Sequence, residues 1–315
     1  MRTAILPIRA MLLKDIRDYQ ILFLSLFLIL GIGTRDWTLR PELIVVAIVT
    51  CLVTQWLAER ATSIAPYLKQ NIANLLKRSD NYPHQPNLNL INPQKSTSLR
   101  SAAITALSLS LLLRTEHYST MILAASLAIL SKFIFQIGHK HFFNPANFGI
   151  IAAITFTKDA WVSPGQWGED WWYALLFLGT GGMILKRVGR WDTTAAFLGS
   201  YALLEAIRNL WLGWTWDVYF HKLMSGSLLL FALFMITDPR SIPNAKISRL
   251  LWAASIALLT FILRNYFFLS TAVFWALFAL APSTIILDYL WTAPIFSWSF
   301  VRSNLSFSRR QQLTT

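Results

Sequence analysis

The stretch GHKHFFNPANFG, residues 138–149, joins two apolar segments and is far denser in polar and aromatic side chains than a simple connection needs. Asn144 followed by Pro145 is typical of a helix start, because an asparagine caps free N–H groups and proline suits the first turn. The stretch therefore predicts a helix that begins at or inside a membrane face. Its positive end would be available to a carbonyl-rich or anionic ligand.

The side chains around this helix start suggest what such a ligand would be. Asn147 lies three residues after Asn144, on nearly the same helix face, and adds two donors and an acceptor. Phe142, Phe143 and Phe148 would supply apolar, aromatic walls. This combination favours a planar heterocycle with amide and imide groups along one edge. His139 and His141 lack a third ligand at metal spacing, so no metal site is predicted.

The composition of the chain is typical of a membrane protein. Of its 315 residues, 55% are hydrophobic and only 14% are charged, which favours an all-α integral membrane protein. The net charge of +13 is spread between apolar segments, so nucleic acid is not an expected partner. The single cysteine, Cys51, lies within an apolar segment and excludes a disulfide framework.

Apolar segments long enough to cross, or nearly cross, a bilayer recur about ten times. Several are shorter than the roughly 20 residues of a straight span, which favours some short or broken helices packed inside a bundle. The predicted segments are 19–34, 42–58, 98–113, 120–137, 145–157, 171–185, 193–212, 220–237, 250–268 and 271–290.

The basic residues predict the orientation. With ten spans and the N-terminus inside, seven of the 28 Lys and Arg residues fall outside and the other 21 inside, as the positive-inside rule requires. Both termini are therefore predicted to be cytoplasmic, in a plasma, inner or thylakoid-type membrane. We expect a basic interfacial segment over 1–18, a polytopic membrane domain over 19–290 and a basic cytoplasmic tail over 291–315. The polar connection 60–97 is expected to be irregular.

Two further places carry charged residues next to or within apolar segments. In FMITDPRSIPNAK, residues 234–246, Asp238 and Pro239 resemble the Asn144–Pro145 pair, and Asp238 could instead pair with Arg240. A simple helix cap is an equally good interpretation of Asp238. Glu205, within the seventh segment, is a candidate cation or proton site, although Arg208 three residues later could be its structural partner.

The two polar clusters together resemble a known family. SKFIFQIGHKHFFNPANFG, followed about ninety residues later by HKLMSGSLLLFALFMITDPRSIP, is similar to the NqrB/RnfD family. This family comprises membrane subunits of the sodium-pumping NADH:quinone oxidoreductase (NqrB) and of the Rnf electron-transport complex (RnfD). The resemblance covers roughly residues 131–288. It implies a ten-helix bundle with an internal inverted repeat, similar to urea channels, that carries flavin and takes part in ion-coupled electron transfer.

The resemblance also bears on the cofactor. In the family, the asparagines of the Asn-Pro motif lie close to a non-covalent flavin, which implies this role for Asn144 and Asn147. Family members also carry FMN esterified to a threonine in an outer Ser-Gly-Ala-Thr segment. Here the corresponding loop is TKDAWVSPGQWGEDWW, residues 157–172, which contains no such segment. Covalent FMN is therefore not expected, and the chain is more similar to shortened, stand-alone relatives.

Three functions remain open from the sequence. The favoured one is a membrane electron-transfer subunit, and a possible oxidoreductase subunit, that binds non-covalent riboflavin or FMN, or a quinone, near the inner face and contacts redox partner subunits. The second is a small-solute or ion transporter with the same bundle, and the third is a structural or assembly subunit. The candidate binding residues are His141, Phe143, Asn144, Asn147, Phe148, Asp238 and Arg240.

Overall fold

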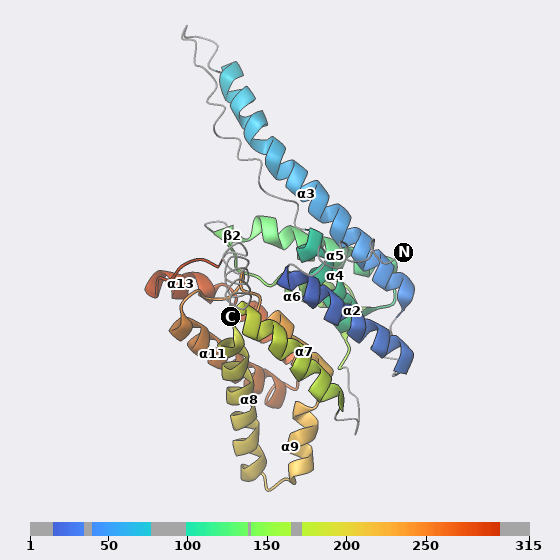
Figure 1. Cartoon of the computed structure of the whole chain (residues 1–315), viewed down its shortest axis with the longest axis vertical. Coiled ribbons are helices and arrows are strands. Elements are labelled where there is room, and N and C mark those ends of the chain that lie inside the picture. Colours follow the sequence, from blue (N-terminus) through green and yellow to red (C-terminus); the bar gives the residue numbers. More distant parts are fainter. Residues whose placement is uncertain (1–14, 35–39, 77–98, 138–139, 165–171, 297–315) are drawn as a thin grey trace, which may run out of the picture.

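The computed structural model describes residues 15–34, 40–76, 99–137, 140–164 and 172–296, and these form a bundle of helices with two short ribbons (Figure 1). The predicted segments 1–18 and 291–315 fall largely outside the described residues. The helices are α2 (Ile16–Thr34), α3 (Pro41–Leu76), α4 (Leu99–Leu112), α5 (Tyr118–Ile134), α6 (Pro145–Phe156), α7 (Trp172–Val188), α8 (Trp191–Trp211), α9 (Trp216–Leu223), α10 (Gly226–Leu230), α11 (Lys246–Asn265), α12 (Ala272–Leu280) and α13 (Ser283–Leu290), with a π-helical turn, η2 (Phe231–Met235).

Each of the ten predicted apolar segments contains a helix, but ten membrane crossings are not confirmed. Among the described residues, three helices are long and apolar enough to span a bilayer: Ile16–Gly33, Pro41–Ile64 and Lys246–Asn265. Two bent pairs raise the number to five if each pair is one span. They are α9 with α10 and η2, bent by 52°, and α12 with α13, bent by 49°.

One prediction about a connection is wrong over part of its length. The segment 60–97 was expected to be irregular, yet its residues 60–76 are helical, because α3 continues to Leu76 and extends well beyond the other helices (Figure 1). Residues 77–97 lie outside the described part of the chain. At about 1.5 Å per residue, its 36 residues span roughly 54 Å, more than the bilayer core requires. The polar composition after residue 60 indicated where the apolar surface ends, but it did not indicate where the helix ends.

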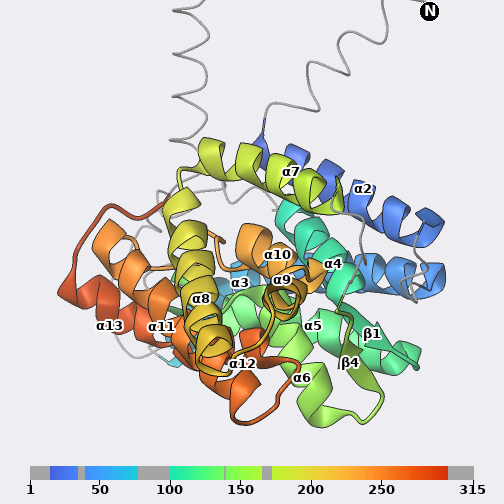
Figure 2. The same ribbon diagram turned by 90° about the horizontal axis from the view of Figure 1, so that it is seen from below.

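The second half of the bundle repeats the packing order of the first. In the first half, α2 packs on α4, α3 packs on both α4 and α5, and α5 packs on α6. In the second half, α7 packs on α10 and η2, α8 packs on η2 and α11, and α11 packs on α12. The first helices of the two halves, α2 and α7, lie side by side (Figure 2). This is the packing expected of two related five-segment halves.

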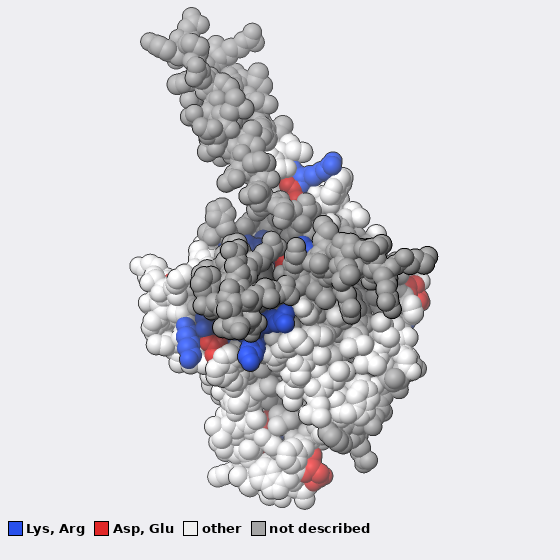
Figure 3. All heavy atoms as spheres, viewed as in Figure 1, with Lys and Arg blue, Asp and Glu red and all other residues white. Residues whose placement is uncertain are grey.

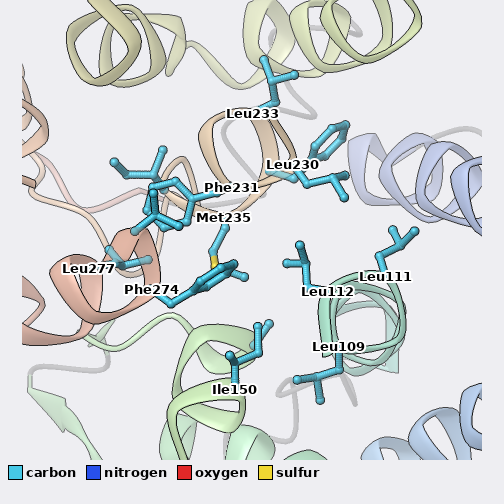
Figure 4. Close-up of a cluster of buried hydrophobic side chains, with 14 of the residues drawn as sticks. Leu109, Leu111, Leu112, Ile150, Leu230, Phe231, Leu233, Met235, Phe274 and Leu277 are labelled. Atoms are coloured by element: carbon cyan, nitrogen blue, oxygen red, sulfur yellow. The ribbon is translucent and has the colours of Figure 1, made fainter. Parts of the chain in front are cut away.

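The core joins the two halves. Side chains from α4 and α6 meet side chains from α10, η2 and α12, with Leu109, Ile150, Phe231 and Phe274 at its centre (Figure 4). On the outside, Figure 3 shows a large uncharged surface, with the described basic side chains of that face near its middle and toward its top and none at its lower end. An uncharged outer surface is what a lipid environment favours.

The two short ribbons close the ends of short helices. Strand β1 (Leu113–Thr115) follows α4 directly and pairs antiparallel with β4 (Ala160–Val162), which follows α6. Strands β2 (Gln136–Ile137) and β3 (Lys140–His141) form a hairpin between α5 and α6. Because hydrocarbon offers no hydrogen bonds, such ribbons supply the partners that a broken helix lacks.

A close approach between helices fixes the position of α6. A Cβ atom on Gly149 would lie 2.5 Å from the backbone oxygen of Ala124 and 2.8 Å from the Cβ of Ala128, both on α5. Neither atom can rotate away, because one belongs to the backbone and the other to a side chain without rotamers. Only glycine therefore permits this spacing of α5 and α6.

We predict that Gly149→Ala will destabilise the protein by about 1–3 kcal/mol, because the added methyl group must push α6 away from α5. The matched control is Gly182→Ala in α7, where an added Cβ meets nothing within 4 Å. The control should be neutral or stabilising by about 0.5–1 kcal/mol through helix propensity. Thermal unfolding in detergent measures both, and equal melting temperatures for the two variants would contradict the packing account.

Candidate functional site

The helix start predicted at Asn144 is present. Asn144 has φ −67° and ψ 125°, its Oδ1 accepts a hydrogen bond from the backbone N–H of Asn147 at 3.0 Å, and Pro145 is the first helical residue. The amide nitrogen of Asn144 also makes a hydrogen bond, because Nδ2 donates to the backbone oxygen of Met235 at 3.1 Å. The side chain therefore caps α6 and ties its start to the end of η2.

Asn147 makes a second tie from the same turn. Its Nδ2 donates to the backbone oxygen of Phe274 at 3.1 Å, linking α6 to α12, while its Oδ1 is buried without a hydrogen-bond partner among the described residues. Pro145 has no N–H, and the N–H of Phe148 makes the first helical bond to Asn144. The N–H of Ala146 is thus the first-turn donor that the cap does not use.

The two polar clusters meet in space. His141 Nε2 lies 3.4 Å from Asp238 Oδ2, although 97 residues separate them in the chain. Asp238 Oδ1 also accepts the backbone N–H of Arg240 at 3.2 Å. Burial raises the pKa of Asp238, but the His141 contact, the backbone N–H of Arg240 and the Arg240 charge together place it below its ordinary value.

The expected similarity between Asp238–Pro239 and Asn144–Pro145 does not extend to the backbone. No helix starts at Pro239; residues 238–245 form a series of turns, and α11 begins only at Lys246. Asp238 therefore holds a turn together instead of capping a helix. A carboxylate that stabilises successive turn N–H groups produces the same Asx-Pro sequence pattern as a helix cap.

A cavity of about 80 Å³ opens where these groups converge. His141, Asn144, Asp238 and Arg240 line it, so four of the seven candidate residues surround one space. Ala146 also lines it, which brings the spare N–H and the positive end of α6 to the same place. The opposite walls are aliphatic and come from Ile104, Ile184, Leu185, Val188 and Leu233.

The candidate phenylalanines lie elsewhere. The ring of Phe143 stacks on Phe278 with centroids 5.0 Å apart and also packs on Phe148 at 5.3 Å. The ring of Phe135 belongs to the same cluster, with its centroid 5.3 Å from those of Phe143 and Phe148. These rings do not line the cavity, and neither does Asn147, so the predicted stacking surface is not part of the pocket wall.

One polar side of the pocket was not predicted from the sequence. Ser101, Thr105 and Ser108 on α4 all line it. Their spacing of four and then three residues places them on one face of a helix, so this signal was present in the sequence. The small hydroxyl side chains in an otherwise apolar segment mark the face of α4 that contacts the pocket.

Glu205, the predicted ion site, lies away from this pocket. It is buried, and its carboxylate binds Lys222 Nζ at 2.8 Å and Asn265 Nδ2 at 2.7 Å. Arg208, considered as a partner, instead places its guanidinium over the Trp214 ring at 4.7 Å. The Glu205 contacts therefore link α8 to α9 and α11. Across the described part of the chain, no cluster of three metal-ligating side chains occurs.

The fold and the pocket define a class of protein: an integral membrane bundle with broken helices and a polar pocket at one break. Residues 154–296 match the sequence profile of the NQR2, RnfD, RnfE family, which confirms the family resemblance and relates the chain to that family. This region contains Glu205, Asp238 and Arg240 and begins after the Asn144 cluster.

Individual relatives agree with this match, and each is the subunit designated D of an ion-translocating oxidoreductase complex. The chain is 32% identical over 104 residues to the protein from Actinobacillus pleuropneumoniae serotype 5b (strain L20), covering 32% of this chain and 30% of the relative. The protein from Vibrio vulnificus (strain YJ016) is 36% identical over 102 residues, 31% of this chain and 28% of the relative. The protein from Halorhodospira halophila (strain DSM 244 / SL1) is 29% identical over 134 residues, which cover 42% of this chain and 36% of the relative. The chain thus spans about a third of the length of these relatives.

We predict that Glu205 and Lys222 are energetically coupled. Lys222→Met alone should cost about 3–5 kcal/mol, because it leaves the carboxylate of Glu205 buried without its counter-charge. Glu205→Gln alone should cost less, because the Lys222 side chain is partly exposed, and the double variant should recover most of the Lys222→Met loss. Thermal unfolding of the four proteins in detergent measures the coupling. The control pair is Glu205→Gln with Arg208→Met, whose effects should add. Additive effects for Glu205 and Lys222 would show that the pair is not structural.

Proposed function

We propose that this protein is an electron-transfer subunit of an ion-translocating oxidoreductase complex, with a non-covalent flavin or quinone in the pocket beside Asn144. The observation that carries the proposal is the contact between His141 and Asp238. It brings the two clusters that resemble the NqrB/RnfD family onto one cavity. The names of the relatives describe subunits of such a complex, which supports redox partner subunits for this chain as well.

The chemistry of the cavity supports a ring with carbonyl groups on one edge. Ala146 offers a backbone N–H at the positive end of α6, and Arg240 adds a cation at the same side. The opposite aliphatic wall would hold the apolar face of the ring. Such a division between a few polar groups and an apolar wall is common in cofactor sites.

The size of the cavity limits how much of a cofactor can be enclosed. About 80 Å³ is smaller than the roughly 300–1,000 Å³ of pockets that enclose a drug-sized ligand. The cavity has room for a quinone head group or for one edge of an isoalloxazine ring, whose remainder would extend from the mouth. The buried Oδ1 of Asn147 has no hydrogen-bond partner among the described residues and could accept an imide N–H, but Asn147 does not line the cavity.

The bound cofactor would supply the electron transfer, and the protein would position it and manage protons. His141 and Asp238 lie on the cavity wall, so that His141 could donate or accept a proton at Nε2 while Asp238 orients its ring. In this proposal the protein lies in a plasma, inner or thylakoid-type membrane with cytoplasmic ends, and electron transfer is coupled to ion movement.

A small-solute or ion transporter is the second candidate. The two bent helix pairs, both in the second half of the bundle, favour it, because discontinuous helices typically form the binding sites of transporters. Cofactor content distinguishes the two candidates, since a transporter of this kind would bind neither flavin nor quinone in stoichiometric amount.

We predict that Ile104→Trp will reduce the cofactor bound per protein at least about tenfold, because the indole would fill the cavity while the Asn144 side chain itself is unchanged. Ile122→Trp is the matched control, since Ile122 is 45% exposed on the lipid-facing side of α5. Absorbance spectra and extraction after gentle solubilisation measure cofactor content, and melting temperatures verify folding. A folded Ile104→Trp variant with its full cofactor complement would contradict the pocket assignment.

We also predict that no flavin is attached covalently. The protein should show no fluorescent band after denaturing electrophoresis under ultraviolet light, because residues 157–172 lack a Ser-Gly-Ala-Thr segment. A flavinylated peptide containing Thr157 or Ser163 would contradict this prediction.

A further inference from the structure

The α4 wall of the Asn144 pocket has a lysine directly behind it. Lys132 lies in the last turn of α5, where its Nζ donates to Ser101 Oγ on α4 at 3.1 Å and lies 3.5 Å from Gln55 Oε1 on α3. Ser101 lines the cavity, whereas Lys132 does not. One serine side chain therefore stands between the ammonium group and the cavity.

This contact leaves Ser101 with a proton to donate. A lysine ammonium group has three donors and no acceptor, so Ser101 Oγ is the acceptor and keeps its own hydroxyl proton. The next hydroxyl on this face, that of Thr105, donates to the backbone oxygen of Ser101, one turn earlier in α4. Ser101 has no such turn before it, because α4 begins at Leu99, and its hydroxyl donates to no acceptor among the described residues. A hydroxyl that accepts a hydrogen bond from a cation is a stronger donor to a third group.

Charged side chains of both signs lie near Lys132. Gln55 is buried and donates from Nε2 to the carboxylate of Glu59 at 2.6 Å, so this acid lies beyond Gln55 and does not line the cavity. Asp238 and Arg240 do line the cavity, and both act on the charge of Lys132. A positive charge therefore stands behind this wall, in surroundings where charges act more strongly than in water.

We propose that Ser101 and Lys132 form an oxyanion subsite of the Asn144 pocket, in which the Ser101 hydroxyl donates to a negatively charged oxygen of the bound ring. Lys132 acts through Ser101 and is a positioning residue. The inference rests on the proposed function, since it requires a ring with oxygen substituents in this cavity. It also specifies the ligand, because an enolate or phenolate oxygen at the edge of the ring should bind better than a neutral group of the same size.

Two ring probes of matched shape test the subsite by equilibrium binding to the full-length protein in detergent, after any bound cofactor has been removed. Phthiocol, a hydroxynaphthoquinone, is an anion at neutral pH. Dimethylnaphthoquinone is its neutral counterpart, with a methyl group in place of the hydroxyl. We expect phthiocol to bind at least about tenfold more tightly, because hydrogen bonds to charged groups are the stronger ones.

Variants of the two residues show whether this preference depends on them. Ser101→Ala and Lys132→Met should each reduce it at least about fivefold, and the double variant should lose no more than either single one, because the two residues act as a unit. Lys132→Arg keeps the charge and should retain most of the preference. Lys246→Met is the control, since Lys246 is exposed at the start of α11 and does not line the cavity. Melting temperatures verify folding, and Ser101→Ala suffices if Lys132→Met does not fold.

The outcomes separate this subsite from the proposed function. Tight and equal binding of both probes would overturn the oxyanion subsite and leave the ring site in place. A preference for phthiocol that survives Ser101→Ala would assign the anion to another group, such as Arg240, and would also overturn the subsite. Binding of neither probe would contradict the ring site itself, and the subsite with it.

Discussion

Backbone polar groups that have no water to bind are the constraint on which this structure depends. Several of its helices end or begin inside the bundle, and each break leaves N–H or C=O groups that must find partners. At η2, side chains supply such hydrogen-bond partners. The hydroxyl of Thr194 donates to the backbone oxygen of Ala232 at 2.6 Å, and the hydroxyl of Thr237 donates to the backbone oxygen of Leu233 at 2.9 Å. Asn144 serves two breaks at once, because it caps α6 and also binds Met235.

The candidate pocket follows from the same constraint. A π-helical turn and a helix start that face each other cannot pack as closely as two continuous helices, so a polar space remains between them. His141 and Asp238 close this space on one side, and the hydroxyl face of α4 closes it on another. The residues that hold the broken helices together therefore also line the candidate pocket, and Asn144 contributes mainly by holding its walls in place.

The sequence predicted the parts of the structure that depend on local chemistry. The helix start at Asn144 and the ten apolar segments could be identified from it, because capping and hydropathy act over a few residues. The partner of Glu205 could not be identified in this way, because Lys222 lies 17 residues further along the chain, on α9, and reaches Glu205 only in the folded bundle. Likewise, Phe143 was expected in the pocket but packs on Phe278, which lies 135 residues away on α12.

We propose a cofactor site in the cavity beside Asn144, and the cofactor content of the protein gives the most direct test. The full-length protein should be solubilised gently, stripped of loosely bound lipid, and extracted for mass spectrometry with isotope-labelled standards for riboflavin, FMN and quinones. We expect one of these compounds in stoichiometric amount, released without proteolysis. Protein that is folded and carries none of them, even after purification with its membrane partners, would contradict it.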